Sequence, residues 1–172
     1  KLTNSKLGPN CAVGDGAIII NSIISGSLNA GRGLRLTKAN VSSSVRLGNE
    51  FVSKTDLTLR DGVVFGDHAL VGANVRVAPG VRAGEYCAIE DGVTIDDGVA
   101  IGPYVELGSR TRVDVGAVLL ADTIVGEGAY IGPYIEAAGM IAAGSYLAYR
   151  QQPIPVWPIP RRTFDDSTKK QG

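Results

Sequence analysis

The chain of 172 residues contains a single histidine, His68, and its side chain is the one best suited to proton transfer near neutral pH. An unperturbed imidazole changes charge near neutral pH, which suits a general base. The carboxylates of Asp67 and Glu85 would orient such a base. Tyr86 and Tyr104 follow His68 at equal intervals along the chain, which predicts equivalent positions in a repeat. The alternative is that His68 is an ordinary surface histidine at a turn.

A metal centre is not expected. The two cysteines, Cys11 and Cys87, have no CxxC spacing, and one histidine does not complete a ligand set with them. We interpret both cysteines as small core residues. A zinc site of three histidines is excluded because the chain has only one histidine.

The segments that would position His68 repeat every six residues. In VRVAPGVRAGEYCAIEDGVTIDDGVAIGPYVELGS (75–109), three residues with alternating inward and outward side chains precede a three-residue turn. No charged residue occupies an inward position from 39 to 143, and Ser53 is the polar exception outside the threonines. An amphipathic α-helix needs apolar spacings of three and four, so this period indicates an all-β parallel β-helix in which each coil buries its face against the next.

The inward positions before residue 24 keep the six-residue period but are offset from the later series. The offset predicts an ejected loop or an irregular coil at about residues 24–34, which contain three glycines. We therefore expect a β-helix domain over residues 1–148 and a proline-rich C-terminal tail over residues 149–172. The prolines exclude a helix through the tail, which would cap the last coil, lie on a neighbouring subunit or act as a linker. Trp157 favours packing.

Three hexads make one coil, so every third hexad falls in the same column on the surface. One outward face is the most apolar and consists of Leu70, Ala88, Glu106, Ile124 and Ala142. The corner before it consists of His68, Tyr86, Tyr104, Asp122 and Met140. An outward apolar stripe predicts a partner surface.

The segments VGDGAI, VFGDHALVGANV, AIGPYVELG and IVGEGAYIGPYI resemble the hexapeptide repeats of the left-handed β-helix transferase superfamily. The resemblance covers nearly all of residues 7–147 and implies the left-handed winding and a homotrimer. Asn4-Ser5 and Asn21-Ser22 also make the start of the chain resemble the C-terminal β-helix of sugar-nucleotide transferases such as the bifunctional N-acetylglucosamine-1-phosphate uridyltransferase family.

The resemblance implies a CoA-dependent acyltransferase, with acetyl-CoA as co-substrate, that acetylates a sugar or a nucleotide sugar. It gives His68 the role of general base in a groove between two subunits. Residues expected to contact the substrate or orient the base are Asp67, Glu85, Tyr86 and Tyr104. Residues expected near the CoA phosphates are Arg150, Arg161 and Arg162. The alternative for Arg161-Arg162 is a solvated basic pair.

The alternative is a noncatalytic trimerising or regulatory β-helix of a larger sugar-nucleotidyltransferase, or a structural scaffold. The chain begins at Lys1 rather than Met, which fits a piece of a larger enzyme. The uridyltransferase family's motif, a histidine followed closely by tyrosine and Gly-Asp, is not found at His68, where Gly66-Asp67 precede it. No glycine-rich nucleotide-binding loop is present in the sequence.

Overall charge gives no reason to expect a nucleic-acid or membrane partner, because 17 basic residues balance 17 acidic ones. No apolar run approaches the roughly 20 residues of a membrane span, and no signal-peptide pattern opens the chain. We therefore expect a cytoplasmic protein.

Overall fold

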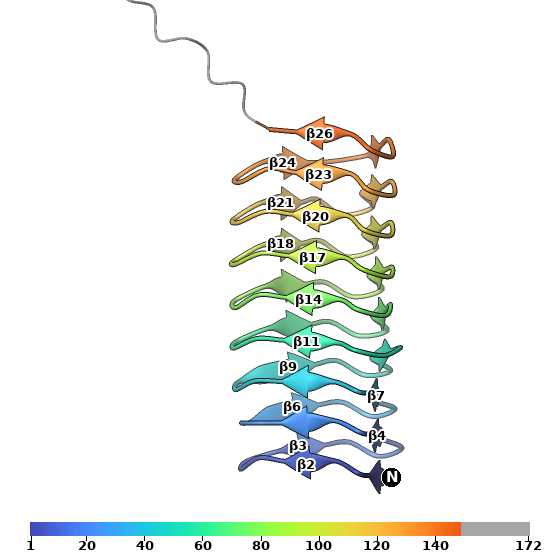
Figure 1. The fold of residues 1–172 in the computed structure, drawn as a ribbon, viewed down its shortest axis with the longest axis vertical. Helices are drawn as coiled ribbons and strands as arrows, with labels where there is room; N and C mark the ends of the chain where they lie inside the picture. Colours follow the sequence, from blue (N-terminus) through green and yellow to red (C-terminus); the bar gives the residue numbers. More distant parts are fainter. Residues whose placement is uncertain (149–172) are drawn as a thin grey trace, which may run out of the picture.

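The computed structural model describes residues 1–148 as a stack of short parallel strands in three sheets. Each turn contributes one strand to each sheet (Figure 1). Sheet A consists of β1 (Leu2–Thr3), β4 (Ile18–Ile20), β7 (Arg35–Thr37), β10 (Val52–Ser53), β13 (Leu70–Val71), β16 (Ala88–Ile89), β19 (Glu106–Leu107), β22 (Ile124–Val125) and β25 (Met140–Ile141). Sheet B consists of β2 (Lys6–Leu7), β5 (Ile23–Ile24), β8 (Asn40–Val41), β11 (Thr58–Leu59), β14 (Arg76–Val77), β17 (Thr94–Ile95), β20 (Arg112–Val113), β23 (Tyr130–Ile131) and β26 (Tyr146–Leu147). Sheet C consists of β3 (Ala12–Val13), β6 (Leu28–Ala30), β9 (Val45–Leu47), β12 (Val64–Phe65), β15 (Arg82–Ala83), β18 (Ala100–Ile101), β21 (Val118–Leu119) and β24 (Glu136–Ala137).

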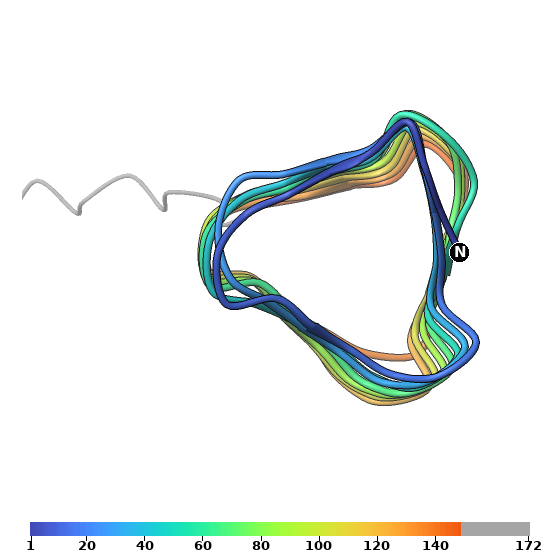
Figure 2. The ribbon, with the colours of Figure 1, turned by 90° about the horizontal axis from the view of Figure 1, so that it is seen from below.

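The chain winds left-handed, as expected. In Figure 1 the chain rises from the N-terminus while sheet B, in front, runs to the left and sheet C, behind, runs to the right. Figure 2 looks along the axis from the N-terminal end and shows the triangular cross-section with its three corners. The all-β parallel β-helix predicted from the six-residue period is confirmed, and its eight strands in sheet C give about eight turns.

The core is a continuous apolar column inside the triangle. Two side chains of each hexad point inward, and those of Leu34, Val63 and Val99 are 0% exposed. Cys87 is buried and Cys11 packs partly buried against the core, in agreement with their interpretation as core thiols. Thr111 and Thr123 also point inward, where their hydroxyls donate to backbone carbonyls. Burial of the inward side chains stabilises the stack through the hydrophobic effect.

The corners use left-handed backbone conformations. The corner from sheet C to sheet A, called the C–A corner, has positive φ at Glu50, His68, Tyr86, Tyr104 and Asp122. The corner from sheet B to sheet C, called the B–C corner, has positive φ at Gly62, Gly80, Gly98 and Gly116. One residue in the left-handed conformation at each corner turns the chain sharply enough to close a triangle.

Coil length changes along the axis, which explains the offset at the start of the sequence. Ile18 pairs with Arg35 and Val52 pairs with Leu70, so the earlier coil is shorter by one residue. The missing residue falls in the corner from sheet A to sheet B, at Asn21 and again at Lys38, both with φ near 50°. Residues 24–34 lie in one of these shortened coils and include β6, so the structure shows no ejected loop there and the irregularity is confined to the length of the coil. A shorter corner shifts the phase without any irregularity in the strands.

The last coil is shorter still, and its length places three residues differently from the prediction. Ile124 pairs with Met140 and not with Ala142, because β25 follows β24 after a shorter corner than the one between β21 and β22. Met140 therefore lies on the outward face of sheet A and not in the C–A corner, and it takes the place predicted for Ala142. Ala143, predicted to point inward, is exposed.

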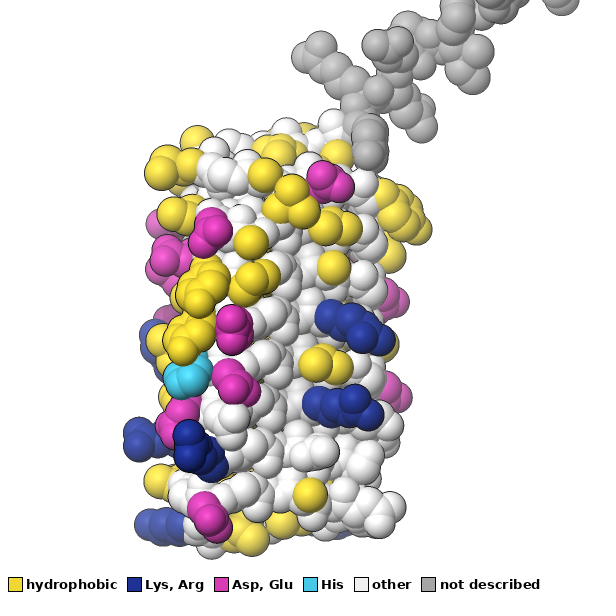
Figure 3. Space-filling model, turned by 180° about the vertical axis from the view of Figure 1, so that it is seen from behind, with side chains coloured by type: hydrophobic (Ala, Val, Ile, Leu, Met, Phe, Trp, Pro, Cys, Tyr) yellow, Lys and Arg dark blue, Asp and Glu magenta, His cyan; other side chains and the backbone are white. Residues whose placement is uncertain are grey.

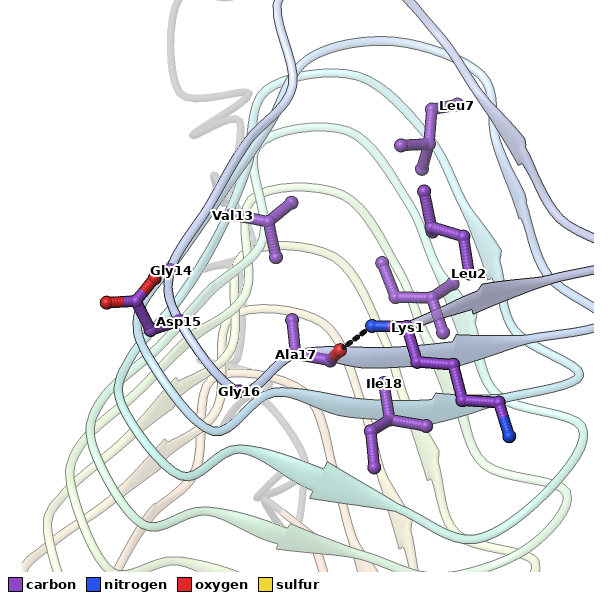
Figure 4. A pocket seen from close by; sticks show the side chains of 10 residues that line it. Lys1, Leu2, Leu7, Val13, Gly14, Asp15, Gly16, Ala17 and Ile18 are labelled. Atoms are coloured by element: carbon purple, nitrogen blue, oxygen red, sulfur yellow. Dashed lines mark hydrogen bonds between the residues drawn. The ribbon is translucent and has the colours of Figure 1, made fainter.

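The lower end of the core is open. A hollow of about 480 Å³ is lined by Leu2, Leu7, Val13 and Ile19 among others, and the Lys1 amino group donates to the carbonyl of Ala17 beside it (Figure 4). Much of this lining is core side chains of the first coils, so the hollow is the end of the core and holds none of the expected site residues. No helix among residues 1–148 has the length and apolar character of a membrane span.

Candidate functional site

The C–A corner stacks three aromatic rings along the axis. The ring centroids of His68 and Tyr86 are 4.6 Å apart with an interplanar angle of 0°, and those of Tyr86 and Tyr104 are 5.2 Å apart at 3°. Successive coils of equal length place the same corner position directly above itself, at about the strand spacing, so rings with the same backbone conformation lie parallel. The equivalence predicted from the spacing of the three residues is confirmed.

The His68 ring stacks on Tyr86 and is accessible to solvent. Its backbone N–H donates to the carbonyl of Asn49 at 2.7 Å, and Tyr86 covers one ring face. Within residues 1–148 the imidazole nitrogens make no hydrogen bond, so their edge is free to meet a ligand. The adjacent tyrosines are about half exposed, at 46% for Tyr86 and 49% for Tyr104. Figure 3 shows the only histidine, in cyan, at the edge of the face formed by sheet C, below hydrophobic side chains.

The Asp67 carboxylate is hydrogen-bonded to Asn49 and not to the His68 imidazole. Its carboxylate accepts hydrogen bonds from the backbone N–H of Asn49 at 2.8 Å and from the Asn49 side-chain amide at 3.0 Å. These bonds hold the pKa of Asp67 below its usual range, and the neighbouring His68 acts in the same direction. Asp67 therefore ties two coils together below His68. Its expected role in orienting His68 stays a prediction.

Glu85 lies one residue before Tyr86 on the coil above His68, and its side chain is exposed. Its backbone carbonyl accepts from Tyr104 N–H at 3.0 Å, which again joins successive corners. Within the described coils its carboxylate forms no ion pair, so its contact with a ligand or with His68 remains a prediction. Arg150, Arg161 and Arg162, expected near CoA phosphates, lie outside the described residues.

The surface of sheet A next to this corner is apolar apart from Glu106, which lies between Ala88 and Ile124. Leu70 is 55% exposed, Ile124 40% and Met140 83%. A shallow hollow of about 270 Å³, lined by Val52, Leu70 and Ala88 among others, lies on the same sheet. The predicted apolar face is present, with Met140 in place of Ala142.

Sequence reasoning missed a polar cluster on sheet B. The Tyr130 hydroxyl donates to Asp114 at 2.6 Å, and Arg112 lies 3.2 Å from Asp96 and 3.9 Å from Asp114. The hydrogen bond with Asp114 raises the pKa of Tyr130 to about 12, and the same bond lowers the pKa of Asp114. Burial raises the pKa of Asp96. The sequence could have revealed this cluster, because Asp96 and Asp114 occupy equivalent positions in successive coils. The cluster joins three coils.

No group of three potential metal ligands from His, Cys, Asp and Glu occurs in the described part of the chain. The polar groups at this corner are the His68 imidazole edge and the hydroxyls of Tyr86 and Tyr104, with the exposed Glu85 carboxylate one residue before Tyr86. Such a set moves protons and forms hydrogen bonds. It suits chemistry at a hydroxyl or amine.

Comparison with known proteins supports the fold. No protein-family model matches the chain, and no curated protein matches it significantly. Among solved structures, UDP-N-acetylglucosamine acyltransferase from Francisella novicida matches with a TM-score of 0.54 and 17% identity, over 81% of this chain and 65% of that chain. The Arabidopsis UDP-N-acetylglucosamine acyltransferase matches with a TM-score of 0.50 and 14% identity, over 84% of this chain and 66% of that chain.

These similarities show that the chain shares its β-helix fold with the two solved structures. The chain spans less than two thirds of the length of either protein. The acetyltransferase domain of PglB from Neisseria gonorrhoeae, solved in complex with acetyl coenzyme A, also matches, at 12% identity over 83% of this chain and 50% of that chain. Its TM-score of 0.20 is too low to support an argument about this chain.

Proposed function

We propose that this chain is a CoA-dependent acyltransferase domain that transfers an acyl group, most simply acetyl, to a hydroxyl or amine of a sugar or nucleotide sugar. The observation that carries the proposal is the His68 imidazole, held by stacking on Tyr86 and free of hydrogen bonds within residues 1–148. A base with these properties has its lone pair available for a substrate proton. Acetyl-CoA is the co-substrate.

In the proposed reaction His68 accepts the proton of the acceptor hydroxyl or amine. The freed oxygen or nitrogen lone pair forms the bond to the thioester carbonyl carbon, the C–S bond breaks, and the CoA thiolate takes the proton back from the imidazolium. Tyr86 and Tyr104 keep the imidazole plane fixed through the stack, so little orientational freedom is lost when the acceptor binds. Their hydroxyls and Glu85 would position acceptor hydroxyls.

We further propose that three copies assemble around a threefold axis through the apolar face of sheet A. Leu70, Ile124 and Met140 are exposed there in one chain, and covering them would remove apolar surface from water. The C–A corner would then face the groove between two subunits. Light scattering tests the assembly: a trimer for the native chain and dissociation in Ile124→Glu are expected, whereas a monomeric native chain would exclude it.

A noncatalytic module is the second candidate, and the regularity of the coils favours it. From Val41 to Ala137 each corner has the same length, and no inserted loop projects over the His68 corner in the part of the chain that the structure describes. Asp67 is also bonded to Asn49 and leaves His68 without a hydrogen-bonded carboxylate. A scaffold requires neither a loop over the His68 corner nor a carboxylate bonded to His68.

The two candidates differ in their behaviour toward acetyl-CoA. The thermal midpoint of the protein should rise in millimolar acetyl-CoA, and a screen of amino sugars and nucleotide sugars should identify an acceptor that releases the CoA thiol. Hydrolysis without acceptor is the blank. If acetyl-CoA neither shifts the midpoint nor releases thiol with any acceptor, the enzyme proposal fails and the scaffold remains.

A further inference from the structure

Sheet C carries two arginines whose charges have no partner in the described coils. Arg46 on β9 and Arg82 on β15 both pair with Val64 on β12, one from below and one from above. Two strand spacings separate their backbones, about 9 to 10 Å. The ion pairs among residues 1–148 involve Lys54, Arg110 and Arg112 as cations and neither of these arginines.

The two arginines line one polar hollow. Its volume is about 420 Å³, which is within the range of small-ligand sites. Polar side chains around it come from the lower coils: Asn10, Ser27, Asn29 and Ser44. The Ser27 hydroxyl oxygen accepts the Ser44 backbone N–H at 3.1 Å, so its own proton is free to donate. Figure 3 shows two basic side chains on the face of sheet C with a hydrophobic one between them.

The hollow exists because the B–C corner has no side chain at this level. Gly62 lines it, with φ of 72°, and a Cβ there would meet only the backbone nitrogen of Gly80, at 3.9 Å. The carboxylate nearest in sequence, Asp61, is not among the lining groups and accepts a hydrogen bond from Ser43 N–H. The lining therefore combines two cations with neutral donors and no anion.

We propose that this hollow binds the diphosphate group of a ligand. Two guanidinium groups on either side of Val64 are each able to give parallel N–H donors to phosphate oxygens, the geometry that arginine matches best. A diphosphate presents oxygens to both arginines at once, whereas a single phosphate or sulfate engages one. Neutral donors from Ser27 and the two asparagines complete the shell without adding repulsion.

The position of the hollow connects it to the His68 corner. The strands of sheet C run toward that corner, and Val64, between the two arginines, precedes His68 by a stretch of chain that spans about 13 Å when extended. A ligand with its diphosphate on Arg46 and Arg82 would extend along sheet C toward the imidazole. This link rests on the proposed function and makes a diphosphate-linked sugar the acceptor class; the anion site itself does not depend on catalysis.

Titration of the native chain with inorganic pyrophosphate at low ionic strength, followed by calorimetry, tests the site. Arg46→Ala and Arg82→Ala should each weaken binding about tenfold or more. The matched control is Arg76→Ala, an exposed arginine on sheet B with the same change in net charge and no ion pair within residues 1–148. It should change the affinity less than twofold.

A second variant tests the geometry independently. Val64→Glu places a carboxylate between the two arginines on the surface and should abolish pyrophosphate binding while the thermal midpoint is kept or raised. Orthophosphate and sulfate should bind at least tenfold more weakly than pyrophosphate. No binding at millimolar pyrophosphate, equal weakening by Arg76→Ala, or equal affinity for sulfate would overturn the diphosphate assignment.

The test separates this inference from the enzyme proposal. Pyrophosphate binding should be unchanged in His68→Asn, which keeps the left-handed backbone that asparagine tolerates. Binding without any acyl transfer would leave the anion site standing and remove the enzyme proposal. Acyl transfer without pyrophosphate binding would support the enzyme proposal and remove the anion site.

Discussion

The C–A and B–C corners have the same backbone and different chemistry. His68, Tyr86 and Tyr104 have φ between 56° and 59°, and Gly80 and Gly98 at the other corner have φ of 70° and 65°. Glycine adopts this region freely, whereas a large side chain costs conformational energy there. The β-helix therefore requires the conformation at both corners but requires large side chains at neither.

The difference indicates where function is expected. Aromatic residues in the left-handed region are uncommon, and here three lie in successive coils with their rings stacked. The glycine corner leaves a bare edge, which opens the hollow beside Arg46 and Arg82. The C–A corner thus presents an imidazole and two phenols, and the B–C corner provides space in the coils where glycine occupies it, although Ser44 and Tyr134 hold the same position in other coils.

Both corners depend on the shared core, and the largest effect should come from breaking it. Ile101 is 4% exposed, so Ile101→Asp places an unpaired charge inside and should prevent folding. Ala100→Asp, on the outward side of the same strand, should fold normally. Circular dichroism distinguishes them, and a folded Ile101→Asp protein would contradict the inward assignment of β18.

His68→Asn is the next largest change and separates the corners by function. If His68 is the base, acyl transfer measured by thiol release should fall about 10²- to 10⁴-fold with the fold and assembly unchanged. Gly80→Asn is the matched control, since it introduces the same side chain at φ of 70° in the B–C corner. Equal turnover in the two variants would remove His68 from the mechanism.

The backbone cost is tested by exchanging residue types between corners. Gly98→Ala should lower the free energy of unfolding by about 1 kcal/mol, because a Cβ there meets nothing within 4 Å and only φ is unfavourable. Asp122→Gly, at φ of 59° in the C–A corner, should change it by less than about 0.5 kcal/mol, since relief of strain offsets the greater unfolded-chain entropy. Urea denaturation measures both free energies of unfolding. If Asp122→Gly lowered the free energy as much as Gly98→Ala, the left-handed conformation would not be strained in the C–A corner as it is in the B–C corner.

The smallest expected effect is the pH dependence from Asp67. Hydrogen bonds from Asn49 lower its pKa in the folded state, so the ionised carboxylate stabilises the fold above the unfolded value near 3.9. That contribution is lost as pH falls through the folded pKa. The thermal midpoint of the native chain should exceed that of Asp67→Asn at neutral pH, and the difference should vanish in acid.

Asn49→Ala supplies the control for this pH dependence. In that background the hydrogen bond from the Asn49 side chain is gone, and Asp67→Asn should have a smaller effect. An Asp67→Asn difference that persists unchanged to pH 2 would show that the charge of Asp67 is not responsible.

Much of the molecule could be predicted from the period alone. An inward side chain every second residue and a turn in every hexad determine which residues enter the core, and Val63, Val99 and Ile131 follow the prediction. The same arithmetic placed His68, Tyr86 and Tyr104 in one column. Coil lengths were predicted less well, because a shortened corner leaves the strands unchanged and shows only as a shift of phase, as at Asn21 and before Met140.

The sequence by itself determined the β-helix, its core and the column that holds the only histidine, because a repeat specifies its own neighbours. Only the tertiary structure decided what each surface group contacts: Asp67 bonds Asn49, Tyr130 bonds Asp114, and Arg46 and Arg82 line one hollow. The physical reason is that the length of each corner sets which residues of successive coils lie next to one another. Polar partners depend on that register and on side-chain reach, which a period of six does not contain.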